Sequence, residues 1–315
     1  MPIKQPVIFD HDGGADDLLS LLLLLTMEHI DLQLVSITPA DCYSEDAVLS
    51  THKILHRFGD PKVPISLGRY NGVNAFPAAW RVQPRAIHAL PLLINEGVDP
   101  DPWQLPDSRK AMATVLEKAE QPVTVLMTGP CSNLMQTLED RPELKARIKE
   151  VVWMGGAVEV KGNVHEYNHD SSAEWNVFWD PYSAKKLLRM GLEIVLIPLD
   201  ATNQVPIDLD FLKQLAKLGT PLADLAGQIW ALTTTNIPTA AYTYYMWDIL
   251  ATSYLDVPEI FELKEAALDV AIEAPNAGET FESVSMETNV RYATGIDKEA
   301  FFRYMLLKFA NEQKG

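Results

Sequence analysis

Cysteine is scarce in this sequence of 315 residues, which contains only Cys42 and Cys131. Two isolated cysteines cannot build the disulfide framework of a small secreted domain, and they lack the spacing of a cysteine-rich zinc site. Low cysteine usage of this kind is typical of a protein that works in a reducing compartment. We therefore expect a cytoplasmic protein whose fold depends on its core rather than on cross-links.

Long apolar runs and a secretory leader are also missing. The longest apolar run, residues 18–27, is interrupted by Ser20 and is shorter than the ~20 residues that a membrane span needs. Residues 1–6 lead into a strand-like segment without the basic head and small-residue cleavage site of a signal peptide. The sequence therefore predicts neither a membrane-spanning segment nor a membrane partner.

Positive charge is in short supply: 26 Lys and Arg face 43 Asp and Glu, which gives a net charge of -17. Such a surface repels phosphate backbones and anionic lipids, so a nucleic-acid partner is not expected. Hydrophobic residues are plentiful, however, at 47% of the chain with seven Trp. This composition supports a sizeable core and excludes a disordered chain.

Short apolar segments alternate with helical stretches through most of the chain. The segments that read as strands are residues 7–9, 34–37, 63–65, 123–127, 151–154, 194–197 and 266–272. Residues 45–58, 207–255 and 297–309 read as mainly helical, and no repeat or linker interrupts the pattern. Continuous apolar strands separated by helices predict a mostly parallel sheet covered on both faces. We expect one large α/β domain of Rossmann-like architecture that spans residues 1–315.

Polar or glycine-containing loops follow four of these strands directly. They are Asp10-His11-Asp12, Thr38-Pro39-Ala40-Asp41, Thr128-Gly129-Pro130 and Gly155-Gly156. In parallel α/β sheets, ligands bind beyond the carboxyl ends of the strands. The four strand ends therefore predict one shared site.

The first of these loops is strongly acidic, because Asp10, Asp12, Asp16 and Asp17 lie within eight residues. Carboxylates so close together repel one another unless a cation relieves the repulsion or water solvates the loop. The position at a strand end favours an oxygen-ligated Ca²⁺ or Mg²⁺ over a solvated turn, and the lack of paired His or Cys argues against zinc. A carboxylate beside such an ion can take a proton from water, which indicates hydrolysis.

Residues 10–17, Asp10-His11-Asp12-Gly13-Gly14-Ala15-Asp16-Asp17, resemble the N-terminal signature of the nucleoside hydrolases, in which two spaced aspartates precede glycine and an aspartate doublet. The resemblance continues in the family's order through Asp41, Thr128-Gly129-Pro130, Met154-Gly155-Gly156-Ala157, Gly162-Asn163-Val164, Ala173-Glu174-Trp175-Asn176 and Trp247-Asp248. It implies the nucleoside hydrolase fold and a calcium-dependent enzyme that hydrolyses the N-glycosidic bond of ribonucleosides.

The resemblance also implies roles for individual residues. Asp12 is similar to the family's general base, which takes a proton from the attacking water. The implied calcium ligands are Asp12, Asp17, Asp248 and the main-chain carbonyl of Thr128. The implied ribose-binding residues are Asp16, Met154, Asn163, Glu174, Asn176 and Asp248. Asp10 and Asp41 correspond to supporting carboxylates, with ordinary turn and cap chemistry as the alternative for Asp41.

The expected base-binding residues are Trp80 and Trp247, which match the purine-specific branch, where two indoles sandwich the base. In the pyrimidine-accepting branch a histidine stands where this chain has Trp247. No histidine is assigned as an acid here, and the following are expected to be surface or supporting imidazoles: His11, His165 and His169. The remaining tryptophans are expected in the core or behind the site: Trp103, Trp153, Trp175, Trp179 and Trp230. A purine nucleoside is the expected substrate.

Two departures from the purine-specific pattern affect these expectations. Gly14 stands where those relatives carry an asparagine that reaches the substrate, so one polar contact is lost. Residues 237–245 lack an arginine that helps to close the site in some relatives, and their Tyr244 and Tyr245 are candidates for a lid or for buried packing. Site closure and base selectivity therefore stay open.

Two function classes other than nucleoside hydrolysis share part of this pattern. Asp10-His11-Asp12-Gly13 also resembles the opening of haloacid-dehalogenase-type, magnesium-dependent phosphatases, but Gly14 and the Asp16-Asp17 doublet disfavour that family. A non-catalytic, calcium-dependent nucleoside-binding protein would lack the general base, and Asp12 is present. The resemblance further implies a role in purine salvage and a homodimer.

Overall fold

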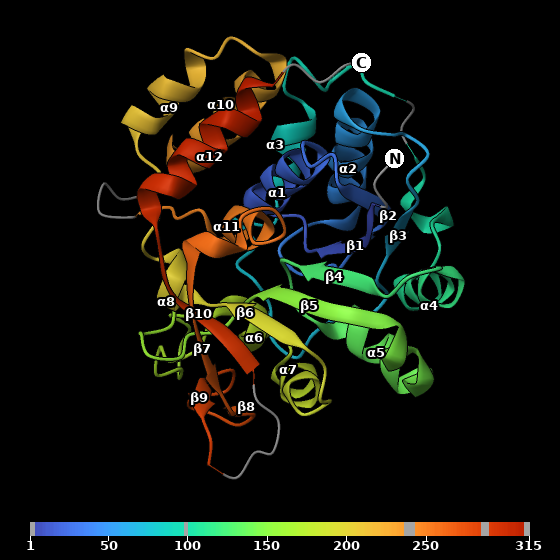
Figure 1. The fold of residues 1–315 in the computed structure, drawn as a ribbon, viewed down its shortest axis with the longest axis vertical. Coiled ribbons are helices and arrows are strands. Elements are labelled where there is room, and N and C mark those ends of the chain that lie inside the picture. The colour runs from blue at the N-terminus through green and yellow to red at the C-terminus, as the bar shows by residue number, and fades with distance from the viewer. Residues whose placement is uncertain (1–3, 98–99, 236–242, 285–289, 312–315) are drawn as a thin grey trace.

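A sheet of eight strands organises the chain in the computed structural model, which describes residues 4–97, 100–235, 243–284 and 290–311 (Figure 1). Its strands are β1 (Gln5–His11), β2 (Ile30–Ile37), β3 (Ile65–Leu67), β4 (Val123–Met127), β5 (Ile148–Met154), β6 (Ile194–Ile197), β7 (Phe261–Ala266) and β10 (Val290–Ile296). They lie side by side in the order β3-β2-β1-β4-β5-β6-β10-β7. A separate antiparallel pair consists of β8 (Leu268–Val270) and β9 (Thr280–Glu282).

All neighbouring strands of the large sheet run parallel except β7, which pairs antiparallel with β10. The prediction of a mostly parallel sheet is therefore confirmed. The strand order reverses between β1 and β4, where Asp10 pairs with Met127. Open α/β sheets bind ligands in the crevice at such a switch point, just beyond the carboxyl ends of the strands.

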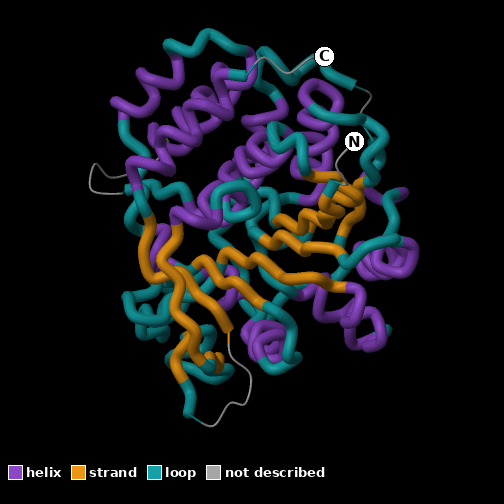
Figure 2. The backbone as a smooth tube through the Cα atoms, in the orientation of Figure 1, coloured by secondary structure: helices purple, strands orange, loops and turns teal. Residues whose placement is uncertain are grey.

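Helices cover both faces of the sheet, as Figures 1 and 2 show. One face carries α1 (Ala15–Leu25), α2 (Ser44–Phe58), α3 (Gln83–His88), α9 (Leu209–Ala216), α10 (Pro221–Thr235), α11 (Trp247–Ser253) and α12 (Lys298–Ala310). The other carries α4 (Ser108–Lys118), α5 (Ser132–Asp140) and α7 (Pro181–Leu188). The short elements are α6 (Trp175–Trp179), α8 (Leu199–Thr202), η1 (Pro102–Gln104), η2 (Pro142–Arg147) and η3 (Pro258–Ile260).

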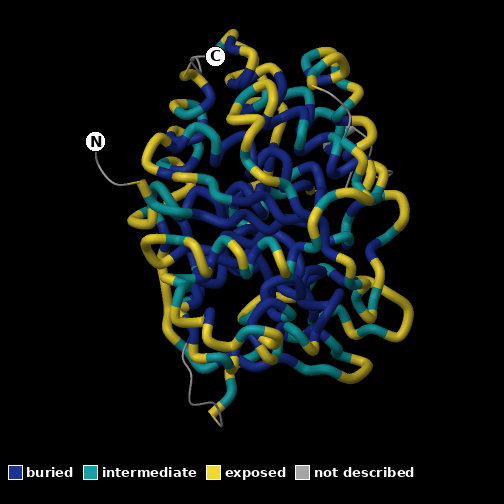
Figure 3. Tube along the Cα trace, turned by 90° about the vertical axis from the view of Figure 1, so that its right-hand side faces the viewer, coloured by how far each residue is buried: buried dark blue, intermediate teal, exposed yellow. Residues whose placement is uncertain are grey.

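The hydrophobic core is divided by the sheet into two large clusters. One lies under α1, whose leucines are almost all buried, and extends to α10, α11 and α12. The other fills the space between the sheet and α4, α5 and α7. Figure 3 shows the resulting buried band across the middle of the molecule, with exposed segments around it. The two clusters, one on each face, support the sheet that carries the strand ends.

Most of the predicted strands and helices are confirmed, with three corrections. The third strand begins at Ile65 and not at residue 63. The expected strand over residues 266–272 is wrong, because β7 ends at Ala266 and β8 covers only Leu268–Val270. The sequence reading also missed β7, β9 and β10, and of these β10 and β7 complete the large sheet beyond β6.

The expectation that Trp103 lies in the core or behind the site is wrong. Its surface is 68% exposed, and its indole lies under the Arg69 guanidinium, with 5.6 Å between the guanidinium carbon and the ring centroid. The other four tryptophans expected inside, Trp153, Trp175, Trp179 and Trp230, are buried. Across the described residues, we find no helix with the length and apolar character needed to cross a membrane.

Candidate active site

The acidic loop connects the end of β1 to the start of α1. Strand β1 extends through His11, so Asp10 lies in the sheet, and Gly13 turns the chain with a φ of 86° that favours glycine. Asp16 and Asp17 occupy the first turn of α1, where the helix dipole favours negative charge. The Asp17 carboxylate accepts a hydrogen bond from the Gly14 amide at 2.7 Å, which fixes it toward the loop.

The ends of β4 and β2 approach this loop from either side. After β4, Gly129 lies so close to Asp12 that an added Cβ would stand 2.7 Å from the Asp12 Cβ. The Thr128 hydroxyl donates a hydrogen bond to the Asp17 carboxylate. After β2, the Asp41 amide donates to Asp12 Oδ2 at 3.3 Å. The strand ends predicted from sequence therefore do meet, with Asp12 between them.

Helix α11 contributes a further carboxylate, because it packs beside α1 and carries Asp248 at its second residue. One carboxylate oxygen each from Asp16, Asp17 and Asp248 lie within 4.8 Å of one another. Asp16 also shares a hydrogen bond with Asp248, and Asp12 shares one with Asp17. Residues distant in sequence thus form one acidic cluster with Asp12 at its edge.

Burial and mutual repulsion make these carboxylates hard to ionise. Desolvation, followed by the neighbouring charges of Asp17 and other cluster members, raises the pKa of Asp12 and of Asp248 well above the usual range. The pKa of Asp16 is raised to about 7 by the same causes, with burial the largest. Asp41 likewise has a raised pKa through burial and the charges of Asp16 and Asp17. A cation in the cluster would remove this penalty.

The donor set fits a hard divalent cation. Its carboxylate oxygens come from Asp16, Asp17 and Asp248, and this three-residue cluster contains no nitrogen or sulfur ligand. The buried Asp41 Oδ1 has no hydrogen-bond partner among the described residues, which is unusual for a buried polar atom. Oxygen-only ligands that are held close together are typical of calcium or magnesium sites and not of zinc sites.

The predicted ribose-binding residues line the adjoining strand ends. Asn176, at the start of α6, donates through Nδ2 to the Thr128 carbonyl at 2.9 Å and to the Met154 carbonyl at 3.2 Å. Glu174 caps α6 and also accepts the Gly156 amide at 2.9 Å. Asn163 is connected to this group through its carbonyl, which accepts from Trp175 Nε1, while its buried Oδ1 has no partner within the described ranges.

Glu174 gives a pH-dependent prediction, because burial raises its pKa from 4.5 to about 7. Between these values the folded state keeps a proton that the unfolded state has released, so stability falls as pH rises. Relative to a Glu174→Gln variant, the wild-type free energy of unfolding should fall by about 2–3 kcal/mol between pH 5 and 8. Denaturant unfolding of both proteins without added metal measures this. A difference that stays constant with pH would mean that Glu174 is already ionised at pH 5.

The two tryptophans expected at the base each belong to an aromatic group, and the group of Trp247 borders the cluster. Trp80 is half-buried, and its ring meets Trp175 edge-on at 5.3 Å and Phe76 at 6.5 Å. Trp247 packs against Tyr244 at 4.7 Å, and its buried Nε1 has no hydrogen-bond partner in the described chain. The two expected base-binding indoles lie in separate aromatic groups, and no described contact joins their rings.

The loop before Trp247 is only partly described, since residues 236–242 lie outside the described ranges. Tyr244 is buried and hydrogen-bonds to Asp16. Among the histidines, His11 is fully buried behind the loop, where its Nδ1 accepts the Gly13 amide at 3.1 Å and its ring stacks on Phe9. His11 is therefore a supporting residue and not a surface one.

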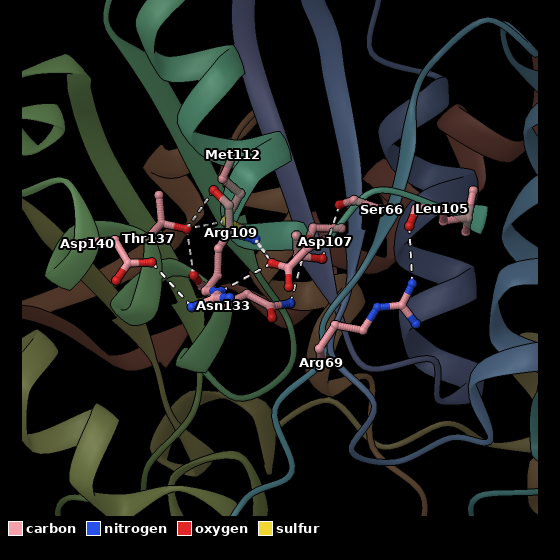
Figure 4. A network of polar contacts seen from close by, with 11 residues as sticks. Ser66, Arg69, Leu105, Asp107, Arg109, Met112, Asn133, Thr137 and Asp140 are labelled. Atoms are coloured by element: carbon pink, nitrogen blue, oxygen red, sulfur yellow. Dashed lines mark hydrogen bonds and ion pairs between the residues drawn. The ribbon is translucent and has the colours of Figure 1, made fainter. Parts of the chain in front are cut away.

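Sequence reasoning missed two side chains that hold the site. Asn133 in α5 donates through Nδ2 to Asp10 Oδ1 at 3.0 Å and to Thr38 Oγ1 at 2.8 Å. Figure 4 shows Asn133 within a polar network that continues through Thr137 and Arg109 to Asp140. The second is Gln83 in α3, which contacts the start of α1. The only local signal for Asn133 was its position five residues after Thr128.

The chain is similar to known proteins along most of its length. A family model described as inosine-uridine preferring nucleoside hydrolase matches residues 7–303. The solved inosine-uridine preferring nucleoside hydrolase from Bacillus anthracis is 35% identical, with a TM-score of 0.89 over 97% of this chain and 99% of that chain.

Two further relatives are described as having different base preferences. The pyrimidine-specific ribonucleoside hydrolase RihA of Klebsiella pneumoniae (strain 342) is 27% identical over 232 residues, which are 71% of this chain and 70% of that protein. A purine-preferring ribonucleoside hydrolase from Gardnerella vaginalis is 23% identical, with a TM-score of 0.78 over 97% of this chain and 98% of that chain. At that identity the second comparison shows a shared fold.

Proposed function

We propose that this chain, which belongs to the inosine-uridine preferring nucleoside hydrolase family and is a ribonucleoside hydrolase, uses calcium and prefers purine nucleosides. One observation carries the proposal: Asp12, Asp16, Asp17 and Asp248 form a buried acidic cluster beside polar strand ends, and Trp247 directly precedes Asp248. Family membership decides against the phosphatase and the non-catalytic binding protein considered above.

The choice of calcium rests on the ligands. The family is metal-dependent, and Asp12, Asp17, Asp248 and the Thr128 carbonyl would hold the ion in this chain. Calcium accepts six to eight oxygen ligands in flexible geometry, whereas magnesium demands a near-ideal octahedron. When bound, the cation offsets the repulsion among the carboxylates and increases the acidity of nearby water.

The reaction replaces the C1′–N bond of the nucleoside by a C1′–O bond from water. Asp12 takes the proton of the attacking water, since it lies at the edge of the cluster with a raised affinity for protons. As the C1′–N bond weakens, its electron pair leaves with the base and the ribose gains positive charge. The surrounding carboxylates favour that charge in the transition state.

The sugar is held by side chains from the end of β5, from loops beside the sheet and from the first turns of α1, α6 and α11. Asp16 and Asn176 bind the ribose 2′- and 3′-hydroxyls, with Asp248 beside them. Asn163 and Glu174 bind the 5′-hydroxyl, and Met154 packs beside the ring. Asn176 is anchored by two main-chain carbonyls, so its remaining oxygen is fixed in direction. Such pre-set contacts let binding energy distort the ring toward the transition state.

Support for purine preference comes from Trp80 and Trp247. The relatives named above are described as acting on inosine and uridine, on pyrimidine nucleosides or on purine nucleosides, so base preference varies among these proteins. This chain has an indole at position 247, where a pyrimidine-accepting enzyme has a histidine, and a half-buried indole at position 80. Large flat rings stack best on the larger purine base.

A substrate panel with a Trp80→Ala variant tests the proposed function. The wild type should release ribose faster from inosine, adenosine and guanosine than from uridine. Removal of the Trp80 indole should lower kcat/KM for the purines through loss of stacking worth about 1–3 kcal/mol, or roughly 5- to 150-fold. Ribose release at several substrate concentrations provides the measurement.

Trp103→Ala is the matched control, because Trp103 is an exposed tryptophan over Arg69 and outside the site. It should keep the wild-type kcat/KM for every nucleoside. Undiminished purine turnover in Trp80→Ala would remove Trp80 from the base site. A wild type that cleaves uridine faster than inosine would contradict the purine preference.

A further inference from the structure

Gln83 makes an unusual contact with the acidic loop. Its side-chain Oε1 accepts a hydrogen bond from the Ala15 amide at 3.1 Å, across 68 residues of sequence. Ala15 is the first residue of α1, and the preceding residue, Gly14, has no side chain with which to cap the helix. Gln83 therefore supplies from α3 the acceptor that the helix start lacks, and its carboxamide is placed beside Gly14.

This contact fixes which end of the carboxamide is free. The Ala15 amide can only donate, so the atom that faces it must be the side-chain oxygen and not the nitrogen. Within the described part of the chain, Gln83 Nε2 donates to no protein group, and the side chain is only half-buried. Because its oxygen is fixed on Ala15, the Gln83 carboxamide presents its free N–H₂ group in a defined direction, as a hydrogen-bond donor.

The surroundings place this donor at the mouth of the active site. Gly14 is bounded by carboxylates, since an added Cβ there would stand 3.1 Å from Asp16 Oδ1 and 3.3 Å from Asp41 Oδ2. The main-chain amide of Gln83 donates a hydrogen bond to the main-chain carbonyl of Trp80 at 2.9 Å, so the two residues belong to one turn. Gln83 is thus joined by a main-chain hydrogen bond to the residue that carries the proposed base-binding indole.

The turn itself is tied to the site at a further point. Arg81, between Trp80 and Gln83, donates through Nε to the Cys42 carbonyl at 3.2 Å, and its own carbonyl accepts the Tyr43 amide at 3.1 Å. Cys42 directly follows Asp41, whose amide contacts Asp12. The position of Gln83 is therefore set by the same loops that position the general base.

We propose that Gln83 is a base-recognition residue whose Nε2 donates a hydrogen bond to a carbonyl oxygen of the leaving base. A 6-oxopurine offers such an oxygen, whereas adenine carries an amino group at the same position. The donor also stabilises the negative charge that develops on the departing base. This inference rests on the proposed purine nucleoside hydrolysis.

Gln83→Glu separates recognition from helix capping. The glutamate keeps an oxygen for the Ala15 amide, so the helix cap is retained, but it has no N–H to donate. Its kcat/KM should fall about 10- to 100-fold for inosine and less for adenosine, so that the inosine-to-adenosine ratio decreases. Hydrolysis of p-nitrophenyl riboside, whose leaving group has no base carbonyl, should stay at the wild-type rate.

Two further variants complete the experiment. Arg85→Gln also makes this segment more negative by one charge, but its side chain is exposed and paired with Asp46, so the substrate ratio should not change. Gln83→Met removes both the donor and the acceptor, and it should lower the inosine-to-adenosine ratio while also lowering the Tm.

The inference is overturned if Gln83→Glu leaves the inosine-to-adenosine ratio unchanged. It is equally overturned if all three substrates lose activity in parallel, because that pattern means a purely structural role. Absence of inosine hydrolysis by the wild type would instead contradict the proposed function. The two failures are therefore distinguished by the wild-type measurement alone.

Discussion

Asp12→Asn is expected to lower kcat for inosine by about 10²- to 10⁴-fold, the range that general-base catalysis contributes. The variant has the same shape, and its Oδ1 can still accept the Asp41 amide that contacts Asp12 in the wild type. It cannot take a proton from the attacking water. Because one repelling carboxyl group is removed from the cluster, the metal-free fold should be at least as stable as that of the wild type.

The assay needs saturating calcium, since loss of one ligand also weakens metal binding. Ribose release gives kcat, and thermal unfolding in the same buffer without calcium reports the fold. Asp200→Asn is a matched control: Asp200 is also buried, but it accepts the Val158 and Glu159 amides outside the acidic cluster. That control should retain the wild-type kcat. Full activity of Asp12→Asn would mean that another group activates the water.

The part of the site that lies on strand ends could be predicted from the sequence. Strands β1, β2, β4 and β5 are continuous apolar segments, and each ends in a polar or glycine-containing stretch that is visible without a structure. Parallel pairing brings these ends to one edge of the sheet. Asp12, Asp41 and Thr128 meet for this reason alone.

The part that depends on distant side chains could not be predicted in the same way. Asn133 reaches Asp10 across 123 residues, and Gln83 reaches Ala15 across 68. Each lies on a helix whose position is decided by packing against the sheet, so no local period or spacing points to its partner. The resemblance covered the proposed sugar- and metal-binding residues, but not the side chains that hold them in place.

The errors in the fold have similar causes. Strand β7 reads Phe-Glu-Leu-Lys-Glu-Ala and is mostly exposed at the sheet edge, so it lacks the apolar run that marked the inner strands. Strand β10 contains Arg291 and Gly295, which interrupt its apolar pattern, although its other residues are largely buried. Trp103 was expected inside because tryptophan is usually buried, yet a short turn leaves it exposed, with the Arg69 guanidinium over its indole.

Calcium is expected to raise the Tm of the wild-type protein by several degrees. Four buried carboxylates with raised pKa values destabilise the metal-free fold at neutral pH, and the ion offsets their repulsion. A ligand present at 100 times its Kd stabilises the folded state by about 2.7 kcal/mol. Asp248→Asn removes one proposed ligand from α11, so its Tm should respond much less to calcium. Thermal unfolding across a calcium series measures both responses.

Calcium binding to the wild type, Asp17→Asn and Asp248→Asn, followed by isothermal titration calorimetry, tests the metal site most directly. We expect one calcium ion per wild-type chain, greatly weakened binding in both variants, and loss of ribose release when a chelator removes the ion. Binding in Asp17→Asn and Asp248→Asn that matches the wild type, or full turnover in the presence of the chelator, would contradict a catalytic calcium held by these aspartates.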